Sequence, residues 1–198
     1  MNIDISGVPE EDLVTIQKSF LEKFKDKISI ELYNPKDIER IKKDTKWIKA
    51  FHKHSIDDQE KTVNMIDEVL TWRKQFGANE LLTPGKLPFN QKFLEMGIFF
   101  KRHKDRNGLP ILNFQVKCHV KGKYPQEEFF KYVAFFLEKE YKFNVEDPII
   151  LLFDTTGAGY SNADMDFTKF LIACLKNYYP GLIQYIMVYE MPLILNGN

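Results

Sequence analysis

The stretch Pro148–Asp154, PIILLFD, constrains the fold of this chain more than any other part of the sequence. It places five apolar residues in a row between a proline and an aspartate. Such a run is too short to span a membrane, and it has no polar face to turn toward water. It therefore predicts a strand buried in the middle of a sheet.

An apolar helical pattern follows this strand. Ser161 or Asn162 stands where a helix cap is needed, and Pro180 with Gly181 ends the pattern before a second strand at Tyr185–Tyr189. The apolar positions of the helix are Phe167, Phe170, Leu171, Cys174, Leu175 and Tyr178. A strand, a helix and a strand within about forty residues form a βαβ unit, which predicts a parallel sheet with a right-handed crossover.

The first part of the chain shows only helical patterns. Pro9 begins one helix, Asn34 caps a second, and Asp57 with Glu60 makes a capping-box pattern for a third, which stops before Gly77. The apolar positions at helical spacing are Leu13, Ile16, Phe20 and Phe24, then Ile38, Ile41, Ile48 and Phe51, then Val63, Ile66, Leu70 and Trp72. An all-helical section is expected here.

A linker rich in proline and glycine, Thr83–Pro88, marks a boundary, so we expect a helical section at 1–82 and a second section at 83–198. Two strands, Ile98–His103 and Leu109–Val116, flank an Asn-Gly pair, which is a strong hairpin signal. Pro125 then opens a helix in which Lys131, Glu138 and Lys139 are expected to face water. Strands alternate with helices to the end, so the expected fold class is α/β, with a mostly parallel sheet flanked by helices.

Composition limits the partners. The chain has 198 residues with 28 Lys and Arg against 28 Asp and Glu, and this balance argues against a nucleic-acid partner. Cys118 and Cys174 are expected to be reduced thiols of a cytoplasmic protein. The acidic N-terminus does not resemble a signal peptide, and no window is long and apolar enough for a transmembrane helix.

No complete catalytic or metal-binding constellation is found in the sequence. Gly157–Gly159 follows a strand, but it lacks the third glycine of a dinucleotide site and the Lys-Ser/Thr of a P-loop, so a plain turn is favoured over a phosphate site. Asp154 has no acid or base partner at a defined spacing and is expected to bond the following turn. His103 and His119, expected on separate strands, have no second ligand at zinc spacing, so no metal is expected.

The segments FDTTGAG and KNYYPGLIQYIMVYEMP resemble the core signature of the CRAL-TRIO lipid-binding family. The front section resembles the helical segment that precedes these domains, through Asp44, Trp47 and Trp72-Arg73-Lys74. The resemblance implies a non-enzymatic domain that holds one lipid or other hydrophobic ligand in an apolar pocket and uses no other cofactor. It also implies lipid, a membrane surface and protein partners at contact sites as partners, with the endoplasmic reticulum as the family context.

Seventeen Phe and nine Tyr are more large rings than a domain of this size needs, although each alone is better explained as core. By resemblance Asp154 points away from the ligand, and strand alternation then gives the side chains on the opposite face. With the rings of the flanking helices, the expected ligand-binding residues are Leu112, Phe114, Val116, Tyr132, Phe136, Ile149, Leu151, Phe153, Phe167, Phe170, Ile186 and Val188.

The sequence departs from the family pattern in two ways. The glutamate that follows the Tyr-Pro pair in phosphatidylinositol-exchanging members is Gly181 here, which argues against phosphoinositide recognition. The chain also ends after MPLILNGN, so about the last fifth of the domain, a further domain and a membrane anchor are expected to be missing. The alternative function is a protein-interaction or regulatory module that keeps the fold without an exchangeable ligand. An enzyme that uses Asp154 and Gly157–Gly159 is the weakest possibility.

Overall fold

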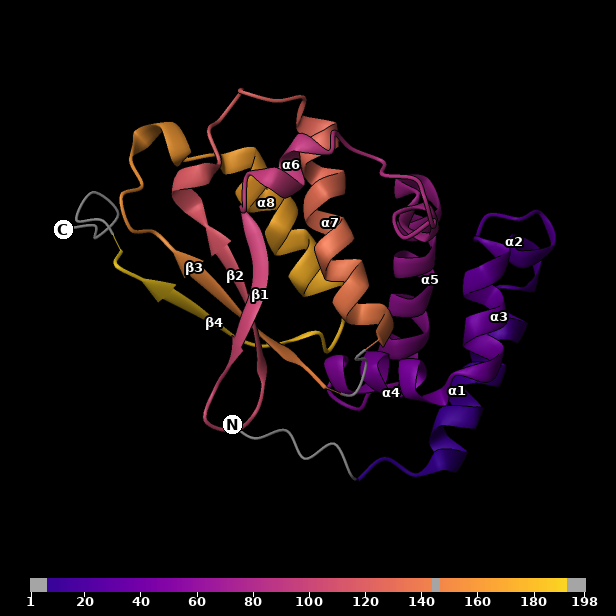
Figure 1. The fold of residues 1–198 in the computed structure, drawn as a ribbon. Helices are drawn as coiled ribbons and strands as arrows, with labels where there is room; N and C mark the ends of the chain where they lie inside the picture. Colours follow the sequence, from indigo (N-terminus) through magenta and orange to yellow (C-terminus); the bar gives the residue numbers. More distant parts are fainter. Residues whose placement is uncertain (1–6, 144–146, 192–198) are drawn as a thin grey trace. The chain divides into compact units, whose positions relative to one another are not determined.

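The computed structural model describes residues 7–143 and 147–191 of the chain (Figure 1). The described residues form two compact units. The helical unit consists of the chain up to Asn79 together with Lys176–Gly181, and the sheet unit consists of Glu80–Leu175 together with the chain from Leu182 onward. The predicted segment MPLILN lies outside the described residues, except for its first residue.

The helical unit is built around α1, α4 and α5, which pack on one another. Its helices are α1 (Glu10–Lys23), α2 (Lys25–Ser29), α3 (Pro35–Lys43), α4 (Thr45–His54) and α5 (Gln59–Phe76). Ile16, Phe20, Ile48, Phe51 and Ile66 are fully buried, as their helical spacing predicts. A front section made of helices is therefore confirmed.

Helix boundaries differ from the predictions in two places. The second predicted helix is two helices, because the side chain of Asp44 accepts a hydrogen bond from Trp47 N (3.1 Å) and so caps α4. The cap of α5 is Asp58, which accepts from Lys61 N (3.0 Å), because Asp57 has a positive φ of 56° and belongs to the preceding turn. The predicted stop at Gly77 is confirmed, since Gly77 takes the left-handed conformation that ends a helix.

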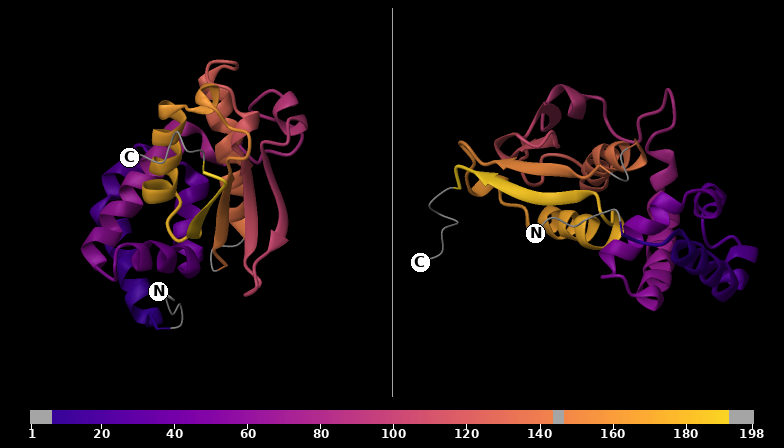
Figure 2. Two further views of the ribbon diagram at one scale, coloured as in Figure 1. Left: turned by 90° about the vertical axis from the view of Figure 1, so that its left-hand side faces the viewer. Right: turned by 90° about the horizontal axis from the view of Figure 1, so that it is seen from below.

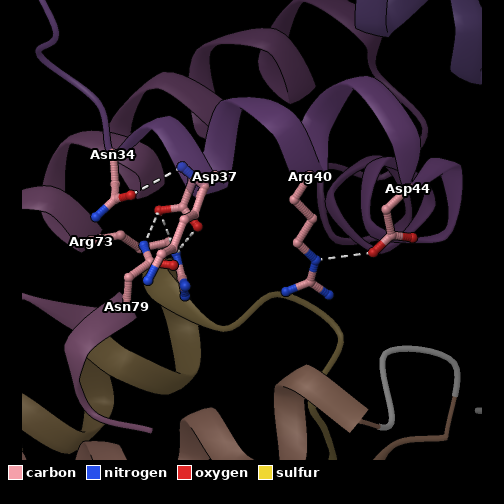
Figure 3. A network of polar contacts seen from close by, with 7 residues as sticks. Asn34, Asp37, Arg40, Asp44, Arg73 and Asn79 are labelled. Carbon is pink, nitrogen blue, oxygen red and sulfur yellow. Dashed lines mark hydrogen bonds and ion pairs between the residues drawn. The ribbon is translucent and has the colours of Figure 1, made fainter. Parts of the chain in front are cut away.

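A buried polar network ties α3 to α5 (Figure 3). Arg73 Nε lies 3.1 Å from both carboxylate oxygens of Asp37, and Asn79 Nδ2 donates to one of them (2.7 Å). The Arg73 and Asp37 side chains are each only 2% exposed. Nearby, Arg40 Nε pairs with Asp44 (2.9 Å), and its guanidinium lies 4.2 Å from the Trp47 ring centre. Removal of one partner from a buried ion pair typically costs about 3–5 kcal/mol, so this network fixes the helix arrangement of the unit.

A short segment from late in the sequence completes the helical unit. Tyr178 stacks on Trp72 with ring centres 4.1 Å apart and planes within 5°. The Lys176 carbonyl oxygen lies 2.8 Å from His54 Nε2. Gly181 has a φ of 76° and passes so close to Ala50 that an added Cβ would lie 3.5 Å from the Ala50 Cβ. Lys176–Gly181 is thus an integral part of this unit.

The sheet unit contains one four-stranded sheet with the order β1-β2-β3-β4. Its strands are β1 (Phe99–Lys104), β2 (Pro110–Gln115), β3 (Ile149–Asp154) and β4 (Ile183–Tyr189). β1 and β2 form an antiparallel hairpin, whereas β2, β3 and β4 run parallel. The mostly parallel sheet with β3 inside it is therefore confirmed, together with the predicted hairpin.

Two long helical segments cover one face of this sheet (Figure 2). α7 (Gln126–Phe143) contacts this face where Phe136 meets Phe99, with ring centres 5.7 Å apart. α8 (Met165–Ala173) contacts it where Phe167 meets Phe114, at 5.2 Å. The remaining elements of the unit are α6 (Lys92–Glu95) and short turns at Val116–Cys118 and Tyr160–Asn162, and a π-helical turn at Cys174–Tyr178 continues from α8.

Two predictions about these helices are wrong. α8 is capped by Asp164, whose side chain accepts from Asp166 N and Phe167 N (3.1 Å each), because the predicted caps Ser161 and Asn162 lie in a separate short turn. Glu138 is only 4% exposed and does not face water. Its neighbours Leu137 and Glu140 are also buried, so the end of α7 is covered on several sides and presents no fully polar face there.

Candidate functional site

The strand register brings the predicted strand residues of the pocket together on the helix-covered face. Leu112, Leu151 and Ile186 are neighbours across β2, β3 and β4. Phe114, Phe153 and Val188 form the next row toward the carboxyl ends of these strands. Because residues paired across a sheet share a face, the two rows form one continuous apolar surface.

An apolar cavity of about 450 Å³ lies at the carboxyl end of this surface. Four of the predicted residues line it: Phe114, Val116, Phe153 and Phe167. The sequence pattern predicts Val116 on the strand, but in the structure Val116 lies in the short turn after β2. The cavity therefore joins the end of the sheet to the first turn of α8.

The other predicted residues lie outside the lining of this cavity. Leu112, Tyr132, Ile149 and Leu151 are buried in the core. Tyr132 Oη accepts a hydrogen bond from Phe99 N (3.2 Å), and burial raises the pKa of Tyr132 to about 12. These four side chains belong to the buried core of the sheet unit.

Two aromatic residues and two β4 residues complete the predicted set. Phe136 stacks on Phe99, and Phe170 stacks on Phe130 with ring centres 4.1 Å apart. Ile186 and Val188 are 51% and 47% exposed. The surface formed by the two rows thus runs from a closed core at β2 and β3 to an open apolar strip at β4.

The loop after β3 and the first turn of α8 supply lining residues that sequence reasoning missed. They are Thr155, Ala158, Gly159, Tyr160, Asn162, Ala163, Asp164, Met165 and Thr168. Tyr160 and Met165 are 78% and 62% exposed and form an apolar rim. A signal was present in the sequence, because ligands of open α/β sheets bind outside the carboxyl ends of the parallel strands, where this loop begins.

Hydrogen bonds hold the loop after β3 in place. Thr155 Oγ1 lies within hydrogen-bond distance of the carbonyl oxygens of Tyr189 (2.7 Å) and Glu190 (2.6 Å), which share its single hydroxyl proton. Gly157 has a φ of 69°, within a turn closed by Ala158 N donating to Thr155 O (2.9 Å). Gly157–Gly159 therefore begins within a hydrogen-bonded turn.

Asp154 also bonds this turn, as expected. Its Oδ1 accepts from Thr156 N (3.0 Å). Hydrogen bonds from the side chain and backbone of Thr156, with the charge of Lys117, hold the pKa of Asp154 below its ordinary value. Its role in the structure is to fix the end of β3.

A buried histidine and an aspartate lie beside the cavity. His119 is 4% exposed, and its Nε2 lies 2.9 Å from Asp164 Oδ2. His119 lies after the turn that follows β2 and not on a strand, contrary to the prediction. Desolvation raises the pKa of Asp164, but hydrogen bonds from Phe167 N and His119 outweigh it, and the pKa lies below its ordinary value. The pair joins the loop at His119 to the cap of α8.

No group of three or more His, Cys, Asp or Glu side chains suited to a metal ion occurs among residues 7–143 and 147–191.

Burial raises the pKa of the Cys174 thiol, which disfavours the reactive thiolate. Within the same residues, no helix is long and apolar enough to cross a membrane.

Comparisons with known proteins agree with this architecture. The chain is similar to the phosphatidylinositol transfer protein CSR1 of Eremothecium gossypii, with 29% identity over 147 residues, which cover 69% of this chain and 34% of that protein. It is also similar to the CRAL-TRIO domain-containing protein C365.01 of Schizosaccharomyces pombe, with 24% identity over 61% of this chain and 36% of that protein. The chain thus spans about a third of the length of these curated relatives.

The fold comparison covers almost the whole chain. The crystal structure of Sfh5 matches with a TM-score of 0.68 and 18% sequence identity, over 99% of this chain and 75% of that one. The CRAL/TRIO domain model matches residues 94–197, which is more than half of the 198 residues. The chain therefore belongs to the CRAL/TRIO domain family.

Proposed function

We propose that this chain binds one hydrophobic ligand, a phospholipid or another lipid, in the apolar cavity at the carboxyl end of the sheet. The observation that carries the proposal is the lining, in which Phe114, Val116, Phe153 and Phe167 surround about 450 Å³. Ligand pockets typically have volumes of about 300–1,000 Å³, apolar walls and few polar groups. This cavity fits a single acyl chain better than a whole two-chain phospholipid.

The open apolar strip at β4 extends the proposed site. Ile186 and Val188 continue the two rows that pass through Leu151 and Phe153, and both are about half exposed. A ligand lying over them would remove their side chains from water, and each methylene group buried contributes about 0.8 kcal/mol. Affinity would then come from the length of the apolar chain more than from a charged headgroup.

The relatives support a role without catalysis. One of them is named as a phosphatidylinositol transfer protein. We extend lipid binding and transfer to this chain, but leave the headgroup open because Gly181 occupies the position of the family's headgroup-region glutamate. The activity would be exchange of lipid at a membrane surface by a cytoplasmic protein.

A narrower relationship is also part of the proposal. The helix sequence NADMDFTKFLIACLKNYYP and the later MPLILN resemble motile sperm domain-containing protein 2. On this resemblance we propose endoplasmic reticulum contact sites, with their protein partners, as the place of action.

The alternative is a protein-interaction or regulatory module with the same fold and no exchangeable ligand. It is favoured by the burial of Leu112, Tyr132, Ile149 and Leu151, each of which is at most 1% exposed, as in a close-packed core. In this case the open strip at β4 would contact a protein.

Uptake of a fluorescent phospholipid by a matched pair of variants distinguishes the two functions. Val116→Trp places a large ring in the cavity, whereas Ile111→Trp places the same ring on the other face of the sheet, at a residue of similar exposure. The proposal expects Val116→Trp to stay folded, at a cost of about 1–3 kcal/mol, and to lose uptake. Ile111→Trp should keep uptake.

Native mass spectrometry of the purified chain, followed by lipid extraction, gives an independent result. Co-purified lipid at close to one per chain supports the proposal. A folded Val116→Trp protein with undiminished uptake would show that the cavity is not the site, and a wild-type protein without lipid or uptake would favour the interaction module.

A further inference from the structure

The β1–β2 hairpin concentrates positive charge in a chain whose charges otherwise balance. Four of the six residues from 101 to 106 are Lys or Arg and a fifth is His, although the whole chain has 28 Lys and Arg against 28 Asp and Glu. The five are Lys101, Arg102, His103, Lys104 and Arg106. The balanced net charge therefore hides a local excess at one end of the sheet.

Most of this charge has no acidic partner. Lys101 pairs with Glu140 of α7 (2.7 Å). Arg102, Lys104 and Arg106 are exposed, and none of them forms an ion pair within the part of the chain that the structure describes. The guanidinium groups of arginine and the ammonium of lysine stay charged at neutral pH.

The one acid of the hairpin is already engaged. Asp105 Oδ1 accepts from Asn107 N (2.9 Å) and Leu109 N (2.8 Å), and its Oδ2 accepts from the Tyr185 phenol (3.0 Å). Asp105 N also donates to Leu109 O (2.9 Å). These bonds hold the turn rigid, so the hairpin presents its cations on a fixed support.

The backbone also directs these side chains. The β1–β2 register shifts between Lys101 and His103, so Arg102 is an extra residue in a bulge. Bulges on edge strands re-aim side chains and break the regular alternation. Arg106 lies beyond the strand, in the turn itself. The cations thus lie along β1 and in the turn that follows it.

Protection of a sheet edge explains only part of this pattern. Charged residues on an edge strand prevent pairing with another chain, which accounts for Arg102 and Lys104. Arg106 does not lie on an edge. The other edge strand, Ile183–Tyr189, carries no charged residue at all. Because this edge has no charge, charged residues do not protect both edges of the sheet.

We propose that the β1–β2 hairpin is an electrostatic contact site for a membrane surface that contains anionic phospholipids. The inference rests on the proposed lipid-binding function and adds to it a membrane-facing element that is separate from the cavity. None of the five basic residues lines the apolar cavity. An exposed group of cations outside the cavity lining suits a broad, negatively charged surface, and clusters of this size attract anionic leaflets.

Vesicle co-sedimentation of the whole chain tests the proposal. Wild-type protein should bind vesicles of phosphatidylcholine with phosphatidylserine, should not bind pure phosphatidylcholine vesicles, and should lose binding as salt rises. The triple variant Arg102→Gln, Lys104→Gln and Arg106→Gln should lower the partition coefficient at least tenfold at low salt. Arg106→Gln alone, which leaves both edges untouched, should lower it several-fold.

A matched control removes the same number of charges elsewhere. Lys18→Gln, Lys25→Gln and Lys74→Gln change three exposed lysines of the helical unit. This variant should bind anionic vesicles as wild-type protein does. Equal binding by the hairpin triple variant and wild-type protein would overturn the proposal, as would wild-type binding to polyglutamate or heparin but not to vesicles.

Failure of this inference is distinguishable from failure of lipid binding. Phospholipid supplied on cyclodextrin reaches the cavity without a membrane, so the hairpin triple variant should take it up as wild-type protein does. A variant that loses both vesicle binding and cyclodextrin-delivered uptake would contradict a separate contact site. If the charges only protected the sheet edge, the triple variant should aggregate, which size-exclusion chromatography detects. In that case Arg106→Gln alone should bind vesicles as wild-type protein does.

Discussion

β3 and β4 are neighbouring parallel strands of similar apolar composition, yet their side chains have different surroundings. Leu151 of β3 is fully buried, whereas Ile186, its partner on β4, is 51% exposed. β3 has a strand on each side and helices over one face. β4 has a strand on one side only, and its side chains are exposed from Tyr185 onward.

The difference shows that an apolar sequence predicts that a strand forms, but does not predict which elements pack over that strand. IILLFD and IQYIMVY both favour strands, but burial depends on the elements packed beside them. An exposed apolar strand usually marks a surface that binds something. β4 is therefore the part of the sheet where function and stability can be separated.

The largest expected effect compares the two paired residues directly. Leu151→Ala should lower the free energy of unfolding by about 2–5 kcal/mol, because it leaves a hole in a closed core. Ile186→Ala should change it by less than about 0.5 kcal/mol, because its side chain already contacts water. Urea unfolding measures both. Equal losses would mean that β4 is covered in solution.

A second test loosens the helix that covers β3. Asp164→Ala removes the cap of α8 and should cost about 1 kcal/mol, whereas Asp164→Asn keeps a capping side chain but removes the charge beside His119. Thermal unfolding compares the two. If both variants were as stable as wild-type protein, the cap would have no role in holding α8 on the sheet.

The charge of Asp164 also predicts a dependence on pH. Its folded-state pKa lies below the ordinary value of about 3.9, so its contribution to stability is present above that pH and is lost as the pH falls through the folded pKa. Asp164→Asn should flatten this acid part of the stability curve. An unchanged slope in urea titrations below about pH 4 would contradict the assignment.

A smaller effect is expected from the link between β4 and the hairpin. Desolvation opposes ionisation of Asp105, but hydrogen bonds from Leu109 N, the Tyr185 phenol and Asn107 outweigh it and lower its pKa. Tyr185→Phe removes one of these bonds, so the pKa of Asp105 should rise toward its ordinary value. NMR titration of the Asp105 carboxyl detects the change, and an unmoved pKa would show that the bond does not form in solution.

The smallest effect is expected where the two strands end together, at the paired residues Asp154 and Tyr189. Asp154→Asn keeps an oxygen that accepts from Thr156 N, so the turn should hold and lipid uptake should be unchanged. Thermal unfolding and uptake assays measure these outcomes. A hydrolase or kinase activity of the wild-type protein that Asp154→Asn abolishes would contradict the proposed non-catalytic role.

Sequence patterns gave the elements of the fold because those elements depend on local signals. The apolar run of β3, the Asn-Gly hairpin and Gly77 at the end of α5 each act through their own backbone or a few neighbours. The predicted caps of α5 and α8 were wrong because nearby polar residues also have a side-chain oxygen that can accept a hydrogen bond at the start of a helix. Only the path of the backbone decides that Asp58 and Asp164 are the ones that reach the free N–H groups.

The candidate site was less predictable because it depends on tertiary surroundings. Strand alternation placed Phe114 and Phe153 together, but it does not show that Leu151 is closed in and Ile186 open. Tyr160 comes from a short turn without a periodic pattern, and Met165 is the first residue of α8. The burial of Glu140 depends on Lys101, a partner 39 residues away.

The placement of Lys176–Gly181 in the helical unit affects how the chain matures during synthesis. A ribosome releases α5 well before Tyr178, about a hundred residues later, so Trp72 first emerges without the ring that stacks on it. The strands and helices of the sheet unit up to α8 are all translated in that interval. The helical unit is therefore the first to begin folding, but it is completed only after most of the sheet unit has been translated. A ribosome stalled before Lys176 would display an apolar tryptophan surface to chaperones.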